Sequence, residues 1–139
     1  MKTLKYVRPT GSYGLFVPSD CEEEKAGTLA SYWRKGSDVL LQLSSHIRNE
    51  GEQISARNRL TARLDRDGHT EAAPDALEAK DCPDCAAASV VDGDGIMWIY
   101  FYGVWKDLMV FGTISGKAAS LRETGEWAFD AVRSICRAG

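Results

Sequence analysis

The chain has 139 residues, of which 44% are hydrophobic and 27% charged, and its formal net charge is −3. This composition is that of a globular protein, and the length predicts a single domain over residues 1–139. The negative charge argues against a general binder of nucleic acid or of anionic membranes, because both need a basic surface on the protein. The negative charge is compatible with an acidic face that meets a basic partner protein.

No stretch of the sequence has the pattern of a targeting or membrane segment. Residues 1–9 lack an apolar core of signal-peptide length, and no apolar run approaches the ~20 residues that a membrane span needs. We therefore expect a cytoplasmic protein that has no membrane partner. In a reducing compartment its four cysteines, Cys21, Cys82, Cys85 and Cys136, are expected to be thiols.

The first third of the chain predicts short strands. Residues 5–7 and 13–17 have strand patterns, with turn residues between them. The segment 19–35 has two interpretations. Acidic residues with capping-box spacing favour a helix, whereas a Lys-Gly pair at its end favours a hairpin. We prefer the hairpin, with an acidic loop at 21–25 and a strand at 28–34.

A strand, a helix and a long loop are predicted next. Residues 39–46 alternate in hydrophobicity and predict a strand. Residues 53–64 carry apolar side chains at helical spacing and predict a helix that stops at Asp67 and the glycine after it. Residues 69–84 show little periodicity and predict a loop, with one short helical turn near 75–79.

The stretch 95–105 contains five aromatic residues and no charge, and the other predicted elements are arranged around it. Strand periodicity places Ile96, Trp98, Tyr100, Tyr102 and Val104 on one face and Met97, Ile99, Phe101 and Trp105 on the other. Because both faces are apolar, we expect a central strand that is covered on both sides. Where the chain itself leaves a side uncovered, a partner would cover it.

Two strands flank this stretch, and an amphipathic helix ends the chain. The strands are predicted at 86–91 and 108–115, and the helix at 127–137. The order of strands, helix, strands and helix predicts an α+β fold. In this fold an antiparallel sheet would have its helices packed on one face.

Cys82-Pro-Asp-Cys85 is a C-x-x-C pair, which is found in zinc sites and in redox sites. A zinc site needs four ligands, and neither His46 nor His69 belongs to a second ligand pair. A thioredoxin-like site expects the pair at the start of a helix in a βαβ unit. We therefore interpret the pair as loop thiols that bind no metal, and keep a small thiol-dependent redox protein as an alternative.

Asp92-Gly-Asp-Gly95 resembles the start of a calcium loop, but the sequence then departs from that motif. Apolar Ile96 and Met97 follow where further oxygen ligands are needed, so we predict a turn between two strands. The sequence contains no Gly-x-Ser-x-Gly elbow, no G-x-G-x-x-G and no Walker loop. We therefore predict a protein without catalytic residues, metal or cofactor.

Two groups of residues are candidates for binding a partner protein. The acidic run at 22–24 is either a solvated surface or part of a recognition face for a basic protein. The aromatic residues of the central strand are either core or interface anchors, which dominate binding energy where interfaces exist. The predicted partner-binding residues are Glu22, Glu23, Glu24, Asp92, Asp94, Trp98, Tyr100, Tyr102 and Trp105.

The layout also resembles known bacterial proteins. The residues that carry the resemblance are Tyr-Trp-Arg-Lys-Gly-Ser-Asp-Val-Leu-Leu-Gln-Leu-Ser-Ser at 32–45, Asp-Gly-Ile-Met-Trp at 94–98, Thr-Ile-Ser-Gly at 113–116 and the terminal helix. The arrangement resembles small α+β proteins of the Mog1/PsbP-like kind. It is similar to compact immunity proteins that protect bacteria from toxins of type VI or related secretion systems.

This resemblance implies a protein that binds and blocks a cognate toxin and has no chemistry of its own. A cytoplasmic location would imply a toxin that acts there, for example on nucleic acid or on a nucleotide. A non-catalytic assembly or structural protein of a larger bacterial complex is the alternative that uses the same sheet.

Overall fold

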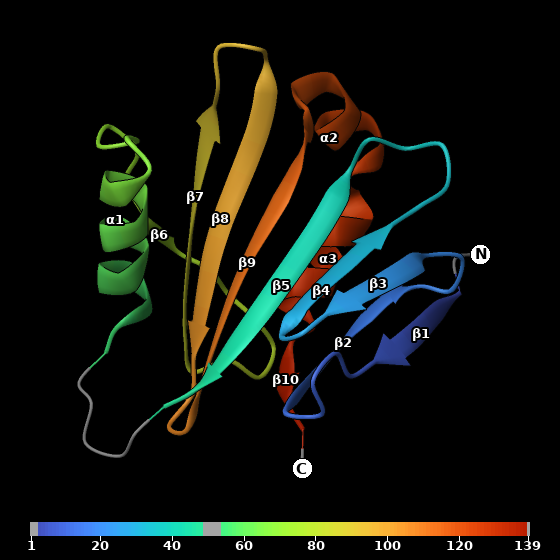
Figure 1. Ribbon diagram of the computed structural model, residues 1–139, viewed down its shortest axis with the longest axis horizontal. Coiled ribbons are helices and arrows are strands. Elements are labelled where there is room, and N and C mark those ends of the chain that lie inside the picture. The colour runs from blue at the N-terminus through green and yellow to red at the C-terminus, as the bar shows by residue number, and fades with distance from the viewer. Residues whose placement is uncertain (1–2, 49–53, 139) are drawn as a thin grey trace.

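Ten strands and three helices form within residues 3–48 and 54–138, the part of the chain that the computed structural model describes (Figure 1). Seven strands make one sheet in the order β3-β4-β5-β9-β8-β7-β6, and three make a smaller sheet in the order β1-β2-β10. Each of these pairings is antiparallel. In chain order the elements are β1 (Leu4–Val7), β2 (Tyr13–Pro18), β3 (Glu22–Ala26), β4 (Leu29–Trp33), β5 (Leu40–Ile47), α1 (Ala56–Arg66), β6 (Asp75–Ala76), β7 (Asp84–Val91), β8 (Ile96–Val104), β9 (Leu108–Lys117), α2 (Ala118–Thr124), α3 (Glu126–Arg133) and β10 (Cys136–Arg137).

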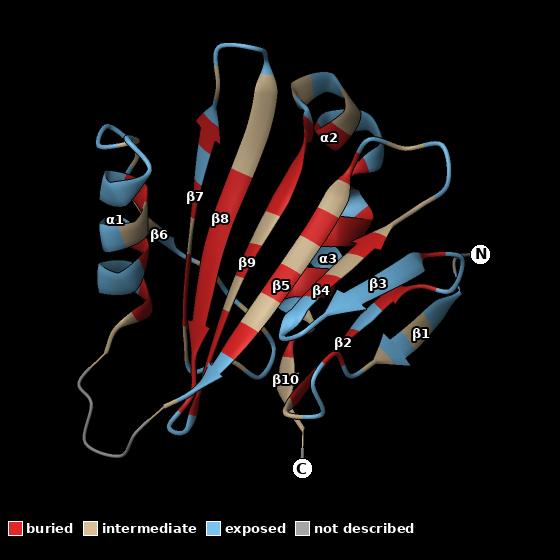
Figure 2. Cartoon of the chain, in the orientation of Figure 1, coloured by how far each residue is buried: buried red, intermediate tan, exposed pale blue. Residues whose placement is uncertain are grey.

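The large sheet has an apolar core on each of its faces, because its central strands carry apolar side chains on both sides. On β8, Ile99 and Phe101 belong to the core that includes α2, α3 and β2. Tyr100 and Tyr102 belong to the core under α1. Figure 2 shows the resulting run of buried residues along β8. The prediction of a central strand covered on both sides is confirmed.

The α+β class and the antiparallel sheet are confirmed, but the helices do not share one face as predicted. α2 and α3 pack with the small sheet on one face, whereas α1 packs against β7 and β8 on the other face. Figure 1 shows α1 beside β7 and shows α3 behind β9 and β5. Since β8 is apolar on both sides, each side needs its own cover.

α1 follows the predicted pattern of apolar positions. Its first turn is capped by Ser55, whose side chain accepts a hydrogen bond of 3.0 Å from the N–H of Asn58. Ala56, Leu60 and Leu64 are buried against the sheet. The helix ends at Arg66, with Asp67 as its C-cap, close to the predicted stop. Position 53, where the prediction began, lies outside the described residues.

Segment 19–35 forms the preferred hairpin, but the acidic residues are not a loop. Glu22–Ala26 is strand β3, which pairs with β4 through a tight turn at Gly27, where φ is 63°. β3 is an edge strand, and all its residues are exposed. Charged side chains suit an edge strand because they oppose pairing with another chain.

The end of the chain differs from the prediction of one helix over 127–137. α3 ends at Arg133, and Cys136–Arg137 pairs with β2 as β10. α2, Ala118–Thr124, was not predicted. The pairing of β10 joins residues from opposite ends of the chain, so no local pattern indicates it.

The predicted helical turn near 75–79 is also absent from this part of the structure. Asp75–Ala76 is a two-residue strand, β6, at the edge of the large sheet beside β7.

None of the helices in residues 3–48 and 54–138 is long and apolar enough to cross a membrane.

Candidate binding face

α1 covers only one end of its face of the large sheet and leaves the other strands of that face at the surface. Val39, Leu41 and Leu43 turn their side chains into the opposite core and are fully buried. The residues between them on β5 therefore point away from that core. We call the exposed surface the open face. It comprises Glu22, Glu24, Leu29, Ser31, Trp33, Leu40, Gln42, Ser44, Phe111, Thr113 and Trp98, with the largely buried Ser115 and Tyr100 on the same side of the sheet.

Strand register brings residues that are far apart in the sequence into rows across the open face. Directly paired residues of antiparallel strands lie on the same side of a sheet. One row runs Glu22, Trp33, Leu40, Ser115 and Trp98. Each row thus crosses from the acidic edge strand to the aromatic strand β8.

The second row has polar side chains in its middle. It runs Glu24, Ser31, Gln42, Thr113 and Tyr100. Nε2 of Gln42 donates a hydrogen bond of 3.1 Å to Oγ of Ser31. The centre of the open face therefore offers hydrogen-bonding groups between two more apolar sides.

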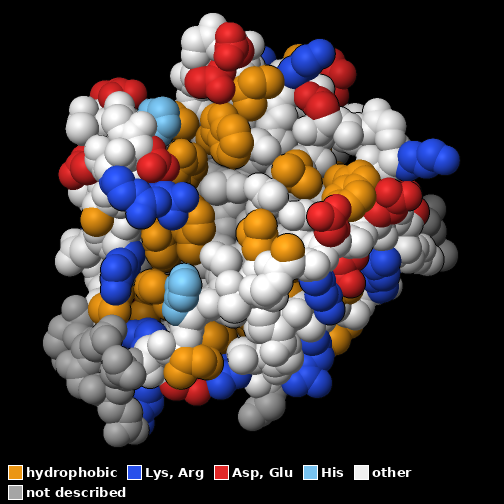
Figure 3. Space-filling view, viewed as in Figure 1, with side chains coloured by type: hydrophobic (Ala, Val, Ile, Leu, Met, Phe, Trp, Pro, Cys, Tyr) orange, Lys and Arg blue, Asp and Glu red, His pale blue; other side chains and the backbone are white. Residues whose placement is uncertain are grey.

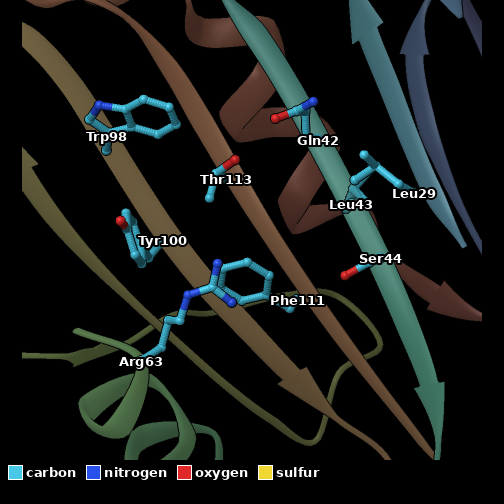
Figure 4. Close-up of a pocket in the computed structure, with 9 residues that line it drawn as sticks. All are labelled: Leu29, Gln42, Leu43, Ser44, Arg63, Trp98, Tyr100, Phe111 and Thr113. Atoms are coloured by element: carbon cyan, nitrogen blue, oxygen red, sulfur yellow. The ribbon is translucent and has the colours of Figure 1, made fainter. Parts of the chain in front are cut away.

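A hollow of about 300 Å³ lies in this centre. Figure 4 shows the aromatic residues Trp98, Tyr100 and Phe111 on one side of it and Leu29 on the other side. Its remaining lining residues are Gln42, Leu43, Ser44, Arg63 and Thr113. The mixed lining can accept an apolar or aromatic side chain that also carries a polar group.

The wall of the hollow beside α1 is a connected set of polar contacts. Oδ2 of Asp67 accepts hydrogen bonds of 3.1 Å from the Tyr100 hydroxyl and from Nε of Arg63. The Arg63 guanidinium carbon lies 4.4 Å from the centre of the Phe111 ring, a cation–π contact. Burial acts to raise the pKa of Asp67, but the hydrogen bonds from Arg63 and Tyr100 outweigh it and lower that pKa. These contacts fix the positions of the Arg63, Tyr100 and Phe111 side chains that line the hollow.

Trp98 is held in place from the turn between β7 and β8. Its indole Nε1 donates to Oδ2 of Asp92 at 3.3 Å. The other oxygen of that carboxylate accepts the N–H groups of Asp94 and Ile96, at 2.9 and 3.1 Å. The bond from Ile96 is the main cause of a lowered pKa at Asp92. Asp92 therefore closes the turn, as the prediction of a turn requires, and also orients Trp98.

The three glutamates of the predicted binding set do not point the same way. Glu22 and Glu24 lie on the open face, because they pair with Trp33 and Ser31. Glu23 lies on the other side of β3, where its carboxylate accepts a hydrogen bond of 2.5 Å from the hydroxyl of Tyr32. Strand alternation at β3 therefore divides the acidic run, which the prediction of a loop did not anticipate.

Trp105 does not lie on the open face and is not an exposed anchor. It is 7% exposed and packs in the core on the opposite side, where its Nε1 donates to the carbonyl of Asp81 at 3.1 Å. Tyr102 is on the side of the open face but is also buried, with its ring centre 4.7 Å from that of Phe111. Asp94 is exposed at the tip of the β7–β8 turn.

Only part of the predicted binding set is therefore brought together at the surface, as Glu22, Glu24 and Trp98, while Tyr100 lines the hollow but is itself buried. Sequence reasoning missed Trp33, Phe111, Gln42 and Arg63. Alternation in the strand at 28–34 indicates that Trp33 faces away from Tyr32, but not which other strands share its side.

Figure 3 shows the open face from the side of the viewer, with hydrophobic side chains on both sides of a band of uncharged polar groups and backbone. Charged side chains of both signs lie at the two sides of this view, over α1 and near β3. The charges of the open face are therefore at its margins.

No group of three or more His, Cys, Asp or Glu in the described ranges 3–48 and 54–138 is placed to hold a metal ion. His46 is exposed near the end of β5. His69 packs edge-on against Tyr100, with ring centres 6.0 Å apart.

The fold and the open face together define the class of this protein as an α+β protein with a half-covered antiparallel sheet. No family model and no curated protein matches the chain. A crystal structure of a protein from Bacteroides thetaiotaomicron VPI-5482 is similar in fold, with a TM-score of 0.73 and 12% sequence identity. The match covers 100% of this chain and 50% of that chain, so the chain spans about half the length of its structural neighbour. At this identity the likeness concerns the fold alone.

Proposed function

We propose that this chain is a protein-binding module and, within that class, a cytoplasmic immunity protein that binds a co-encoded toxin and occludes its active site. The observation that carries the proposal is the open face. Five strands of the large sheet present aromatic, aliphatic, polar and acidic side chains there, and α1 covers only one end of that side of the sheet.

The open face has the composition of a protein interface. Aromatic residues anchor such interfaces, and polar groups between them supply hydrogen bonds. Trp98 is oriented by Asp92 and Arg63 is oriented by Asp67 before any partner arrives. Side chains that are already held lose little conformational entropy on binding, which favours affinity.

The charges of the open face suit a toxin with a basic active site. A toxin that acts on nucleic acid or on nucleotides has such a site, because its substrate is an anion. Glu22 and Glu24 would meet it from the edge strand. Long-range attraction between the two surfaces would raise the association rate, and the aromatic contacts would slow dissociation.

Co-expression tests the immunity function. Cells that produce the product of the neighbouring gene, a toxin on this proposal, are expected to survive only when this chain is also present. A variant with a bulky cation in the middle of the open face, Thr113→Arg, is expected to lose protection. The matched control is Ser89→Arg, which adds the same side chain at an exposed position on the opposite side of the sheet.

Binding measurements with the purified toxin separate contact from charge. Thr113→Arg is expected to weaken binding by at least about tenfold, or about 1.4 kcal/mol. Glu22→Lys/Glu24→Lys is expected to slow association by roughly tenfold at low salt and to weaken its dependence on ionic strength. Glu71→Lys/Glu78→Lys makes the same change of charge on exposed loops outside the open face and serves as control.

Two results would contradict the proposal. Equal death of cells with and without this chain would exclude the immunity function. Unchanged binding by Thr113→Arg, with the fold intact, would exclude the open face as the interface.

A further inference from the structure

The C-x-x-C segment is held firmly at the end of the sheet, on the side opposite to the open face. The N–H of Leu77 donates to the carbonyl of Cys85 at 2.8 Å, so the chain that precedes the C-x-x-C pair is hydrogen-bonded to β7. The Trp105 indole and the backbone N–H of Arg137 each bind Asp81, both at 3.1 Å. The N–H of Lys80 donates to a carbonyl of α3 at 2.9 Å. The two thiols are thus positioned by contacts from several elements, which a free loop would lack.

The two thiols differ in their surroundings. Cys85 lies within β7 and is 9% exposed, whereas Cys82 precedes the strand and is half-buried. The Cys82 thiol donates a hydrogen bond of 3.2 Å to the carbonyl oxygen of Asp84. Cys82 is therefore the more accessible thiol of the pair, and Cys85 is the less accessible one.

Hydrogen bonds between the thiols increase this difference. The hydrogen bond from the Cys85 thiol to the Cys82 sulfur, helped by the backbone of Asp84 and Val104, lowers the pKa of Cys82. The same hydrogen bond and burial raise the pKa of Cys85. Cys82 therefore becomes a thiolate more readily than an ordinary cysteine, and the thiolate is the reactive form.

A depression of about 580 Å³ gives access to the pair. It is lined by residues 76–80 and by residues 82–85, which include both cysteines. This volume accommodates a small peptide-like molecule beside the sulfur of Cys82.

We propose that Cys82 and Cys85 form a thiol–disulfide exchange site that takes small-molecule disulfides, with Cys82 as the attacking thiol and Cys85 as the resolving thiol. This activity does not depend on the proposed function, because the site lies outside the open face.

The reaction proceeds in two balanced steps. The Cys82 thiolate attacks one sulfur of the small disulfide, so that a mixed disulfide forms and one small thiolate leaves. The Cys85 sulfur, after losing its proton to the departing thiolate or to water, then attacks the Cys82 sulfur. A Cys82–Cys85 disulfide forms and the second small thiol leaves, so the small disulfide is reduced by two electrons and the protein is oxidised by two.

Oxidised glutathione is the probe for this proposal, and peptide mapping by mass spectrometry is the readout. In the wild-type protein we expect a disulfide between Cys82 and Cys85 that dithiothreitol reverses. Cys136 is the internal control, because it is also half-buried and its sulfur lies 3.5 Å from the Tyr6 hydroxyl. Cys82 is expected to react at least about tenfold faster than Cys136, since the lowered pKa of Cys82 increases its own thiolate fraction.

Variants separate the two roles. Cys85→Ser is expected to accumulate a mixed disulfide between glutathione and Cys82, because the resolving thiol is missing. Cys82→Ser cannot form the internal disulfide. Its Cys85 is expected to form a mixed disulfide with glutathione much more slowly than Cys82 does in Cys85→Ser. Cys136→Ser serves as the matched control and is expected to form the Cys82–Cys85 disulfide as the wild type does.

Trp105 supplies a second readout that needs no variant. A Cβ atom added at Gly103 would lie 3.1 Å from the Cys82 sulfur and 3.0 Å from the Trp105 ring, so both pack over the same glycine. Oxidation of Cys82 is therefore expected to change the tryptophan fluorescence of the protein, to which Trp105 contributes. Equal reaction of Cys82 and Cys136 in the wild type, or no Cys82–Cys85 disulfide, would overturn the proposal, whether or not the serine variants fold.

Discussion

The hydroxyl of Tyr100 on β8 donates a hydrogen bond of 3.1 Å to the carboxylate of Asp67, the C-cap residue of α1. Nε of Arg63 donates to the same oxygen at the same distance. The carboxylate thus joins the last turn of the helix to the central strand. It also fixes one wall of the open face, so stability and the proposed binding surface share this contact.

Asp67→Asn is expected to reduce the loss of stability in acid. The folded state lowers the pKa of Asp67, so its charge stabilises the fold above the unfolded pKa, about 4, and this contribution is lost as pH falls through the lower folded value. Near neutral pH the variant should be about 1 kcal/mol less stable than the wild type. Urea unfolding at neutral pH and near pH 3 measures the difference in free energy of unfolding between the wild type and the variant. A difference that is equal at the two pH values would contradict the prediction.

Two buried tyrosines are expected to respond in opposite ways to removal of the hydroxyl. Tyr13 is fully buried, and its hydroxyl has no hydrogen-bond partner within the described residues. Tyr13→Phe should therefore stabilise the fold by about 1 kcal/mol, because an unpaired buried hydroxyl is costly. Tyr32→Phe removes the bond to Glu23 and should destabilise by about 1 kcal/mol. Thermal or urea unfolding of the pair checks this, and a loss of stability in both variants would refute it.

Gly112→Ala is expected to destabilise the sheet. A Cβ atom at this position on β9 would lie 2.2 Å from the Phe101 ring and 2.8 Å from the carbonyl oxygen of Gln42. Since backbone and a fully packed ring must both shift, we expect a loss of about 1–3 kcal/mol. Gly93→Ala is the matched control, because a Cβ atom there meets no atom within 4 Å. Comparable unfolding midpoints for the two variants would show that the core adapts to the added methyl group.

Trp127 on α3 is expected to be a major contributor to stability. It is 4% exposed and belongs to the core that includes α2 and α3. Trp127→Ala should cost about 3–5 kcal/mol and lower the melting temperature by roughly 10 °C. The indole Nε1 is buried without a hydrogen-bond partner in the part of the chain described, so Trp127→Phe should cost much less. An alanine variant that melts within about one degree of the wild type would contradict the buried position.

Local periodicity was sufficient to predict most strands and the first helix. Val39, Leu41 and Leu43 alternate with less apolar residues, and all three are fully buried on one side of β5. Ala56 and Leu60 recur at helical spacing, and both face the core. In each case neighbours in the sequence are also neighbours along the element, so the pattern records which side is buried.

The extent of the open face was not predictable in this way. Glu22 and Trp98 belong to one row only because β4, β5 and β9 lie between them in a particular register. Alternation correctly placed Trp105 on the face opposite Trp98, but it did not show that Trp105 lies in the core whereas Trp98 is partly exposed. Aromatic character alone does not distinguish an anchor from a core residue.

The sequence by itself determined the fold class, the hairpins and the central strand, because these depend on residues close together along the chain. The tertiary structure alone decided that α1 lies opposite α3, that Glu23 turns toward Tyr32, and that residues 136–137 pair with β2. Each of these features depends on the register and order of strands that are distant in the sequence. Register is set by the packing of the whole sheet, since one residue of slip would exchange the buried and exposed sides of a strand.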